Sequence, residues 1–256
     1  MITIGIDIGS TATKSVMLND KREVLASDVV LTGGSNVKSA DLTLNNLLKK
    51  TNLERGDIDK IVATGYGRDN VNADKAISEI TCHAKGMFFT NPNIRTILDI
   101  GGQDSKAISI DEEGNVLNFL MNDKCAAGCG RFLEIIARSL NVKLEEMSSL
   151  SEQATDLIRI TSMCSVFAET EVVSLVASGC TVPNILKGIH NSIAERTISL
   201  MLSVGIVDQI GMSGGVAKNK EVIRALEKNL NKTISVPDEP QIIGALGAAC
   251  IGQTLC

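Results

Sequence analysis

Two short segments of the sequence place a cysteine just before a stretch with helical spacing. Residues 122–130 (NDKCAAGCG) carry Cys125, and residues 162–166 (SMCSV) carry Cys164. Unpaired N–H groups and the positive dipole end at a helix start favour thiolates and the anionic clusters that thiolates hold. Four-thiolate ligation of an iron–sulfur cluster needs two such chains around a two-fold axis. The segments therefore predict a [4Fe–4S] cluster that bridges a homodimer.

The chain has seven cysteines in all, and the odd count and irregular spacing argue against a disulfide framework. Cys129 could form a metal pair with Cys125, but a radical-SAM triplet would need a cysteine at position 132, which is Phe132. We expect Cys129 to be a nearby thiol that does not bind the cluster, and its presence leaves the ligand set open. The remaining thiols are expected to be ordinary ones, because free cysteine behaves as a small hydrophobe: Cys82, Cys180, Cys250 and Cys256.

Three glycine-containing segments have the residue types of a nucleotide site. Residues 7–14 combine an aspartate with glycine, hydroxyl residues and a lysine, and residues 99–104 repeat an acidic, glycine-rich turn. Glycine lets the backbone approach a phosphate, and consecutive N–H groups form an anion nest. In residues 211–219 a predicted strand ends in two consecutive glycines. Glycine there lets the backbone lie against a nucleoside. Each segment alone also suits an ordinary turn, and the three in this order predict a cleft for ATP and Mg²⁺.

The residues expected to contact ATP and its metal come from all three segments. Asp7 and Asp99 are expected to hold Mg²⁺ through water. Asp7, Asp104 and Gln103 are the candidate catalytic residues, with Gln103 the candidate to position the attacking water. The expected nucleotide-binding residues are Gly9, Ser10, Thr11, Lys14, Gly101, Gly102, Gln103, Gly214, Gly215, Lys218 and Asn219.

Composition excludes several other functions. The 256 residues are 44% hydrophobic and 21% charged, which is typical of a soluble globular protein. A net charge of −5 gives no basic footprint for nucleic acid, and the lack of tryptophan argues against stacking platforms for bases. The sequence has no run long enough for a membrane span and no signal peptide at its start. We therefore expect a cytoplasmic protein that binds neither nucleic acid nor membrane.

One order of elements occurs twice along the chain: a strand, an acidic glycine-rich turn, two further strands, then helices. Strands are predicted at 2–8, 13–18, 24–31, 58–64, 94–100, 106–110, 116–121, 206–212 and 233–236. Helices are predicted at 37–50, 75–87, 131–140, 166–178, 182–203, 221–229 and 241–251. We expect two related α/β subdomains, residues 1–95 and 96–240, that close over the nucleotide, with 241–256 packing back on the first. His83 and His190 fall in predicted helices and have no assigned role.

The three nucleotide segments resemble the phosphate and adenosine segments of the actin–sugar kinase–Hsp70 ATPase superfamily, and this resemblance covers the whole chain. The cysteine segments are more specific. Residues 122–134 and 163–171 resemble the activators of 2-hydroxyacyl-CoA dehydratases, which are ATPases of the BadF/BadG/BcrA/BcrD type. That family also includes ATPase subunits of benzoyl-CoA reductase and reductases of double-cubane-cluster proteins. Cys129 departs from the pattern, because relatives more often have a small hydroxyl residue there.

The resemblance implies an actin/Hsp70-like ATPase fold and a homodimer with one [4Fe–4S] cluster bound by Cys125 and Cys164 of each chain. It also implies ATP-driven transfer of one low-potential electron to an iron–sulfur dehydratase or reductase, with reduced ferredoxin or flavodoxin as donor. Two other functions stay open. A sugar or acyl kinase of the superfamily would use Asp104 as its catalytic aspartate, with both cysteines incidental. The third possibility is an interaction protein that senses nucleotide.

Overall fold

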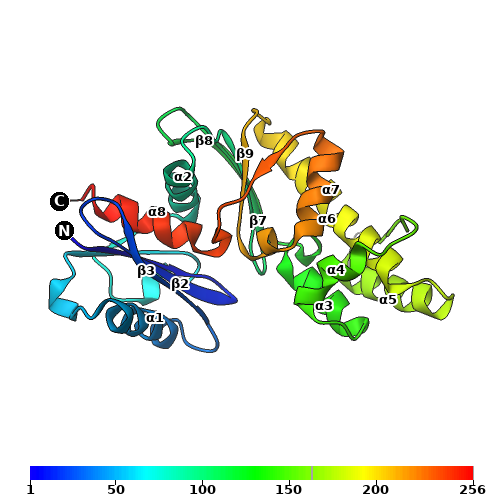
Figure 1. Cartoon of the computed structure of the whole chain (residues 1–256), viewed down its shortest axis with the longest axis horizontal. Coiled ribbons are helices and arrows are strands. Elements are labelled where there is room, and N and C mark those ends of the chain that lie inside the picture. Colours follow the sequence, from blue (N-terminus) through cyan, green and yellow to red (C-terminus); the bar gives the residue numbers. More distant parts are fainter. Residues whose placement is uncertain (163, 256) are drawn as a thin grey trace.

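The structure is a computed structural model that describes residues 1–162 and 164–255. Met163, in the second cysteine segment, and Cys256, expected to be an ordinary thiol, lie outside the described residues. Each of the two lobes is built on a five-stranded mixed sheet, and helices lie on and between the sheets (Figure 1). None of the helices in the described part of the chain is both long and apolar enough to cross a membrane.

The first sheet has the strand order β3-β2-β1-β4-β5. Its strands are β1 (Thr3–Ile8), β2 (Ala12–Leu18), β3 (Val24–Leu31), β4 (Lys60–Thr64) and β5 (Lys75–Ala76). Successive side chains of a strand point to opposite faces. Ile4, Ile6 and Ile8 therefore share one face, as predicted, and they pack in a core cluster with apolar residues of α1 (Asn36–Thr51). The other face of β1 packs against α8 (Ile243–Gly252).

The second sheet repeats the first, which confirms the predicted internal repeat. Its order is β10-β9-β6-β7-β8, so β6 to β10 occupy the places of β1 to β5. The central strand again pairs antiparallel with the next strand and parallel with the fourth. The strands are β6 (Thr96–Ile100), β7 (Ser105–Ile110), β8 (Val116–Asn122), β9 (Ile210–Ser213) and β10 (Ile234–Ser235).

The remaining helices follow the predicted order with shifted boundaries. They are α2 (Glu79–Thr90), α3 (Gly130–Ser139), α4 (Met147–Ser151), α5 (Ser165–Ala177), α6 (Val182–Val204) and α7 (Lys220–Leu230). The helix predicted at 75–87 begins too early, because Lys75–Ala76 pair with β4 as a short strand. The strand predicted at 206–212 is irregular before Ile210. The five residues of α4 escaped prediction because they are too few to show a helical period.

The helices α2 and α8 cross between the two sheets (Figure 1). Their backbones touch at glycines. A Cβ added to Gly86 would lie 2.1 Å from the carbonyl oxygen of Ile243, and one added to Gly247 would lie 1.7 Å from that of Cys82. Only glycine permits so close an approach. This crossing joins the lobes and brings the C-terminal helix back to the first sheet, while the subdomain bounds 1–95 and 96–240 stay a prediction.

Candidate nucleotide cleft and cysteine loops

A cavity of about 620 Å³ lies between the lobes. Its walls come from the hairpins β1–β2 and β6–β7, from α2 and α3, and from the turn after β9. The residues predicted to bind ATP or Mg²⁺ all line this cavity: Asp7, Gly9, Ser10, Thr11, Lys14, Asp99, Gly101, Gly102, Gln103, Asp104, Gly214, Gly215, Lys218 and Asn219. Segments from three parts of the sequence therefore meet in one cleft.

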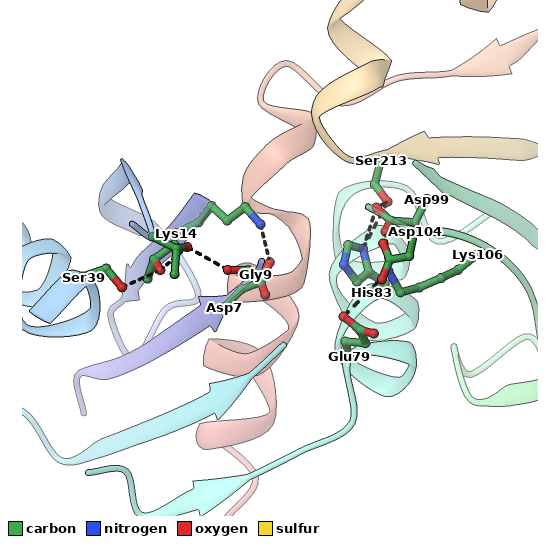
Figure 2. Close-up of polar contacts among 12 residues, drawn as sticks. Asp7, Gly9, Lys14, Ser39, Glu79, His83, Asp99, Asp104, Lys106 and Ser213 are labelled. Carbon is green, nitrogen blue, oxygen red and sulfur yellow. Dashed lines mark hydrogen bonds and ion pairs between the residues drawn. The ribbon is translucent and has the colours of Figure 1, made fainter. Parts of the chain in front are cut away.

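Each lobe places the same Asp–Lys pair in the cleft (Figure 2). On the first sheet Asp7 lies opposite Lys14 in the strand register, and Lys14 Nζ donates to Asp7 Oδ2 at 3.0 Å. On the second sheet Asp99 lies opposite Lys106, and Lys106 Nζ donates to Asp99 Oδ2 at 3.2 Å. Both aspartates are almost fully buried. The internal repeat thus brings two carboxylates to the cavity from opposite sides, where they could hold a hydrated divalent cation.

Two glycines with positive φ keep the backbone close to these carboxylates. Gly65 follows β4 with φ +85, and a Cβ there would lie 2.4 Å from Asp7 Oδ1. Gly214 follows β9 with φ +88, and a Cβ there would lie 2.9 Å from Asp99 Oδ1. A side chain would be strained at either position and would displace the carboxylate. This gives a physical reason for the glycine that ends each of these parallel strands.

Lys106 is a cleft residue that the sequence analysis missed. It is fully buried, and its Nζ lies 2.8 Å from Asp104, 3.2 Å from Asp99 and 3.7 Å from Glu79. Burial opposes the charge of Lys106, but these three carboxylates outweigh it, so the pKa of Lys106 lies above its usual range. Burial likewise opposes ionisation of Asp99, and the positive charges beside it hold its pKa well below the usual value. The sequence did contain a signal, because Lys106 follows Asp99 by the spacing at which Lys14 follows Asp7.

His83 was also missed as a cleft residue, because a lone histidine in a helix carries no local signature. It projects from α2 toward the second sheet (Figure 2). Its Nδ1 lies 3.1 Å from Ser213 Oγ and 3.4 Å from Asp99 Oδ1, and Ser213 Oγ donates to Asp99 Oδ1 at 2.8 Å. A helix outside the sheet thereby reaches the carboxylate at the end of β6.

The hairpins β1–β2 and β6–β7 touch each other, and the second one also contacts α3. A Cβ added to Gly102 would lie 2.3 Å from Thr11 Oγ1 across the cleft. On its other side the hairpin accepts two hydrogen bonds from the start of α3. Gly130 N donates to Gly101 O at 2.9 Å, and Arg131 N donates to Gly102 O at 2.7 Å. The hairpin therefore satisfies N–H groups that a helix start otherwise leaves unpaired.

In the part of the cavity wall that follows β9, Asn219 forms the N-cap of α7. Its Oδ1 accepts from Glu221 N at 3.1 Å and from Val222 N at 3.2 Å. Its amide nitrogen lies 3.1 Å from His190 Nε2, and burial lowers the pKa of His190 to about 4. Asn219 thus shapes this wall with a side chain whose polar atoms are already bonded within the protein.

The cysteine loops meet at Arg196 on α6. One guanidinium nitrogen donates to Ala127 O at 3.2 Å and the other to Ser162 O at 2.7 Å. Those carbonyls lie two residues after Cys125 and two residues before Cys164, and both thiols are exposed. Burial lowers the pKa of Arg196, and the two neighbouring thiols oppose that shift. The structure therefore brings the two predicted ligand loops to one cationic side chain.

The second loop is also held by Glu171 on α5. Its carboxylate accepts from Thr161 N at 2.9 Å and from Ser162 N at 2.8 Å. These hydrogen bonds outweigh the effect of burial and lower the pKa of Glu171 to about 2. Cys164 is the N-cap residue of α5, so its thiol lies at a helix start as predicted.

Cys129 differs from the two exposed thiols. It is fully buried, and its Sγ donates to Ala126 O at 3.0 Å. Burial raises the pKa of the Cys129 thiol, which disfavours the thiolate that a metal needs. In the described residues no three His, Cys, Asp or Glu side chains gather as a metal site. Two exposed thiols per chain thus fit a cluster only if a second chain supplies two more.

Comparisons with known proteins find similarity along the whole chain. Residues 4–252 match the BadF/BadG/BcrA/BcrD ATPase family. The activator of lactoyl-CoA dehydratase from Anaerotignum propionicum is 50% identical over 252 residues, which cover 97% of this chain and 96% of that protein. The structure of the activator of the 2-hydroxyisocaproyl-CoA dehydratase from Clostridium difficile, with bound ADPNP, is similar at 46% identity with a TM-score of 0.95, covering 100% of this chain and 95% of that one.

A third similar protein is component A of the (R)-2-hydroxyglutaryl-CoA dehydratase of Acidaminococcus fermentans. Its crystal structure has a TM-score of 0.96 and 42% identity, covering 100% of this chain and 98% of that one. These likenesses confirm the predicted actin/Hsp70-like ATPase fold, and they span the cleft and both cysteine segments. The chain therefore belongs to the BadF/BadG/BcrA/BcrD ATPase family and is similar throughout to activators of 2-hydroxyacyl-CoA dehydratases.

Proposed function

We propose that this protein is an ATP-hydrolysing activator that delivers single low-potential electrons to an iron–sulfur dehydratase or reductase. Besides the family match, one structural observation supports coupling between ATP hydrolysis and the cysteine loop. The hairpin that would hold the phosphates is hydrogen-bonded to the first N–H groups of α3, and α3 follows directly on the loop of Cys125. A change at the γ-phosphate can therefore move the cysteine loop through two adjacent hydrogen bonds.

The proposed redox site uses Cys125 and Cys164 from each of two chains. A [4Fe–4S] cluster bound there would supply one-electron chemistry. Arg196 and Glu171 fix the loops that carry the thiols, and the start of α5 provides the positive end of its dipole. Cys129, buried beside the first loop, is left out of the ligand set.

An uncovered apolar surface on α5 supports the proposed homodimer. Val166, Phe167 and Val173 are 65%, 68% and 55% exposed. They lie on the helix that begins at Cys164, so a second copy that covers them would also bring its own thiols to this end of the molecule. Exposed apolar patches of this kind mark protein interfaces.

The proposed nucleotide site uses the cleft between the lobes. Asp7 and Asp99 would hold Mg²⁺ through water, and Asp104 and Gln103 would face the γ-phosphate. Contacts to ATP that ADP cannot make would favour one orientation of the lobes, because a ligand shifts an equilibrium only by its differential affinity. Electrons would come from a reduced ferredoxin or flavodoxin, and the protein would act in the cytoplasm.

The test is whether nucleotide changes the cluster site. The protein is purified without oxygen, and its reduction potential and rate of iron chelation are measured with ATP, with ADP plus a γ-phosphate mimic, with ADP and without nucleotide. Coupling between separated sites is typically about 1–3 kcal/mol. We expect the ATP and mimic states to differ from ADP in both quantities. A brown protein with the same potential and chelation rate in all four states would overturn the coupling, while a colourless protein with sugar-stimulated ATP turnover would establish a kinase instead.

A further inference from the structure

We propose that His190 is a positioning residue for the nucleotide, because it holds the Asn219 amide with an N–H donor, and not the carbonyl oxygen, toward the cleft. The inference rests on the proposed ATP site and deepens it. Its evidence is a chain of hydrogen bonds that joins α4, α6 and α7. These helices pack together in the second lobe, and residues at α4 and α7 line the cavity (Figure 1).

The start of α7 decides which way the Asn219 amide points. Its Oδ1 accepts from Glu221 N at 3.1 Å and from Val222 N at 3.2 Å, as the side chain of an N-cap residue does. Reversing the amide would place its NH₂ group against two N–H donors. The oxygen is therefore held on the helix side, and Nδ2 is the atom that lies 3.1 Å from His190 Nε2.

This orientation fixes the tautomer of the His190 ring. Asn219 Nδ2 can only donate, so Nε2 must accept and carries no proton. In the neutral ring the proton then lies on Nδ1, which is 3.1 Å from Ser151 Oγ on α4. The ring is fully buried, and each of its nitrogens has one defined partner.

A second hydrogen bond joins α4 and α7 at the cavity itself. Ser148 on α4 lines the cavity, and its Oγ accepts from Glu221 N at 3.0 Å. The two helices are therefore linked twice, directly through Ser148 and indirectly through the His190 ring, which lies between Ser151 and Asn219. This arrangement fixes the spacing of the two cavity-lining side chains, Ser148 and Asn219.

The amide nitrogen of Asn219 has two protons, and His190 accepts one of them. No other acceptor in the described part of the chain lies within hydrogen-bond distance of Nδ2. Asn219 is partly exposed and lines the cavity, so the second proton is available to an acceptor atom of the bound nucleotide. Loss of the acceptor at Nε2 would leave an amide proton unpaired, which favours other rotamers of Asn219 and weakens this contact.

The test compares two amide substitutions in the cluster-containing protein, which is purified without oxygen. In His190→Gln the side-chain oxygen can take the place of Nε2 and accept from Asn219. In His190→Asn the shorter amide can take only the place of Nδ1 and bond Ser151. Because one hydrogen bond typically changes an equilibrium by about 2- to 10-fold, the Kd for ADP should rise by that factor in His190→Asn and stay at the wild-type value in His190→Gln. The kcat for ATP hydrolysis should change little in both variants.

Nitrogen-15 NMR of labelled histidine checks the geometry without relying on a variant's stability. The His190 ring, identified as the signal absent from His190→Gln, should have Nδ1 protonated and Nε2 unprotonated. Asn219→Asp keeps the helix cap but offers Nε2 an acceptor, so Nε2 should become protonated. Ser149→Ala is the matched control, because Ser149 lies on the same short helix as Ser151 but is exposed and bonds Glu146 O. Its Kd for ADP should equal that of wild type.

Two results would overturn the inference. One is a wild-type ring whose Nε2 carries the proton. The other is a Kd for ADP that is the same in His190→Asn and His190→Gln, whether both equal wild type or both are weaker, because the ring would then act through packing alone or not at all. A wild type that binds ADP but hydrolyses no ATP would overturn the proposed function instead, and the Kd values would still decide the inference.

Discussion

At the level of single residues, exposure separates the thiols near α3 and α5. Cys125 and Cys164 are exposed beside Arg196, whereas Cys129 is buried and bonded to the backbone. We expect wild type to hold about four iron atoms per dimer, following four-thiolate ligation. Cys125→Ser or Cys164→Ser should abolish the iron and its visible absorbance, and Cys129→Ser should largely spare both. Loss of absorbance only in the Cys129 variant would reverse the assignment.

Removing the lysine from each of the two buried Asp–Lys pairs should lower the free energy of unfolding by different amounts. Lys106→Ala would leave Asp99 buried without its cation, and breaking a buried pair by removing one partner costs about 3–5 kcal/mol. Lys14 is less buried than Lys106, so water can replace it and Lys14→Ala should lower the free energy of unfolding by less. Urea unfolding of both variants measures the difference. Equal losses would mean that solvent reaches both pairs alike.

At the level of elements, the sequence predicted most strands and helices because their apolar periods are long and regular. Ile4, Ile6 and Ile8 showed which face of β1 is buried, and the acidic turns showed where the hairpins lie. What the sequence did not show depends on contacts between elements. His83 reaches the cleft only because α2 packs under the second sheet, and Arg196 meets both cysteine loops only because α6 passes behind them.

The burial of His190 on α6 makes the free energy of unfolding depend on pH. Burial lowers the pKa of His190 from 6.5 to about 4, with Glu221 opposing this shift. The folded pKa lies below the unfolded one, so protons favour the unfolded state between these values. Stability should be fully present above pH 6.5 and fall as the pH drops toward 4, by at most about 1.4 kcal/mol per pH unit. Urea unfolding of wild type and His190→Gln across this range should show a steeper loss in wild type, and parallel curves would contradict the prediction.

At the level of the whole molecule, the proposed nucleotide and cysteine sites use different residues, and we expect that each can be disabled alone. Asp7 and Asp104 line the cavity, whereas Cys125 and Cys164 are not among its lining residues. Asp7→Asn and Asp104→Asn should each impair Mg²⁺-dependent ATP hydrolysis, because each removes a charge that is proposed to face the metal or the γ-phosphate. Neither substitution should reduce the visible absorbance of the protein. Phosphate release and visible absorbance, measured on the same sample, check both expectations, and normal turnover in both variants would remove the cleft as the site of hydrolysis.

The repeated Asp–Lys pair has a consequence for how many chains each proposed site needs. Each sheet with its hairpin supplies half of the proposed nucleotide site, and both halves lie in one polypeptide. The cysteine loops are also half of a site, but their second half would come from another molecule. The proposed nucleotide site is therefore complete within one chain, whereas the proposed redox site would exist only at protein concentrations that keep two chains together.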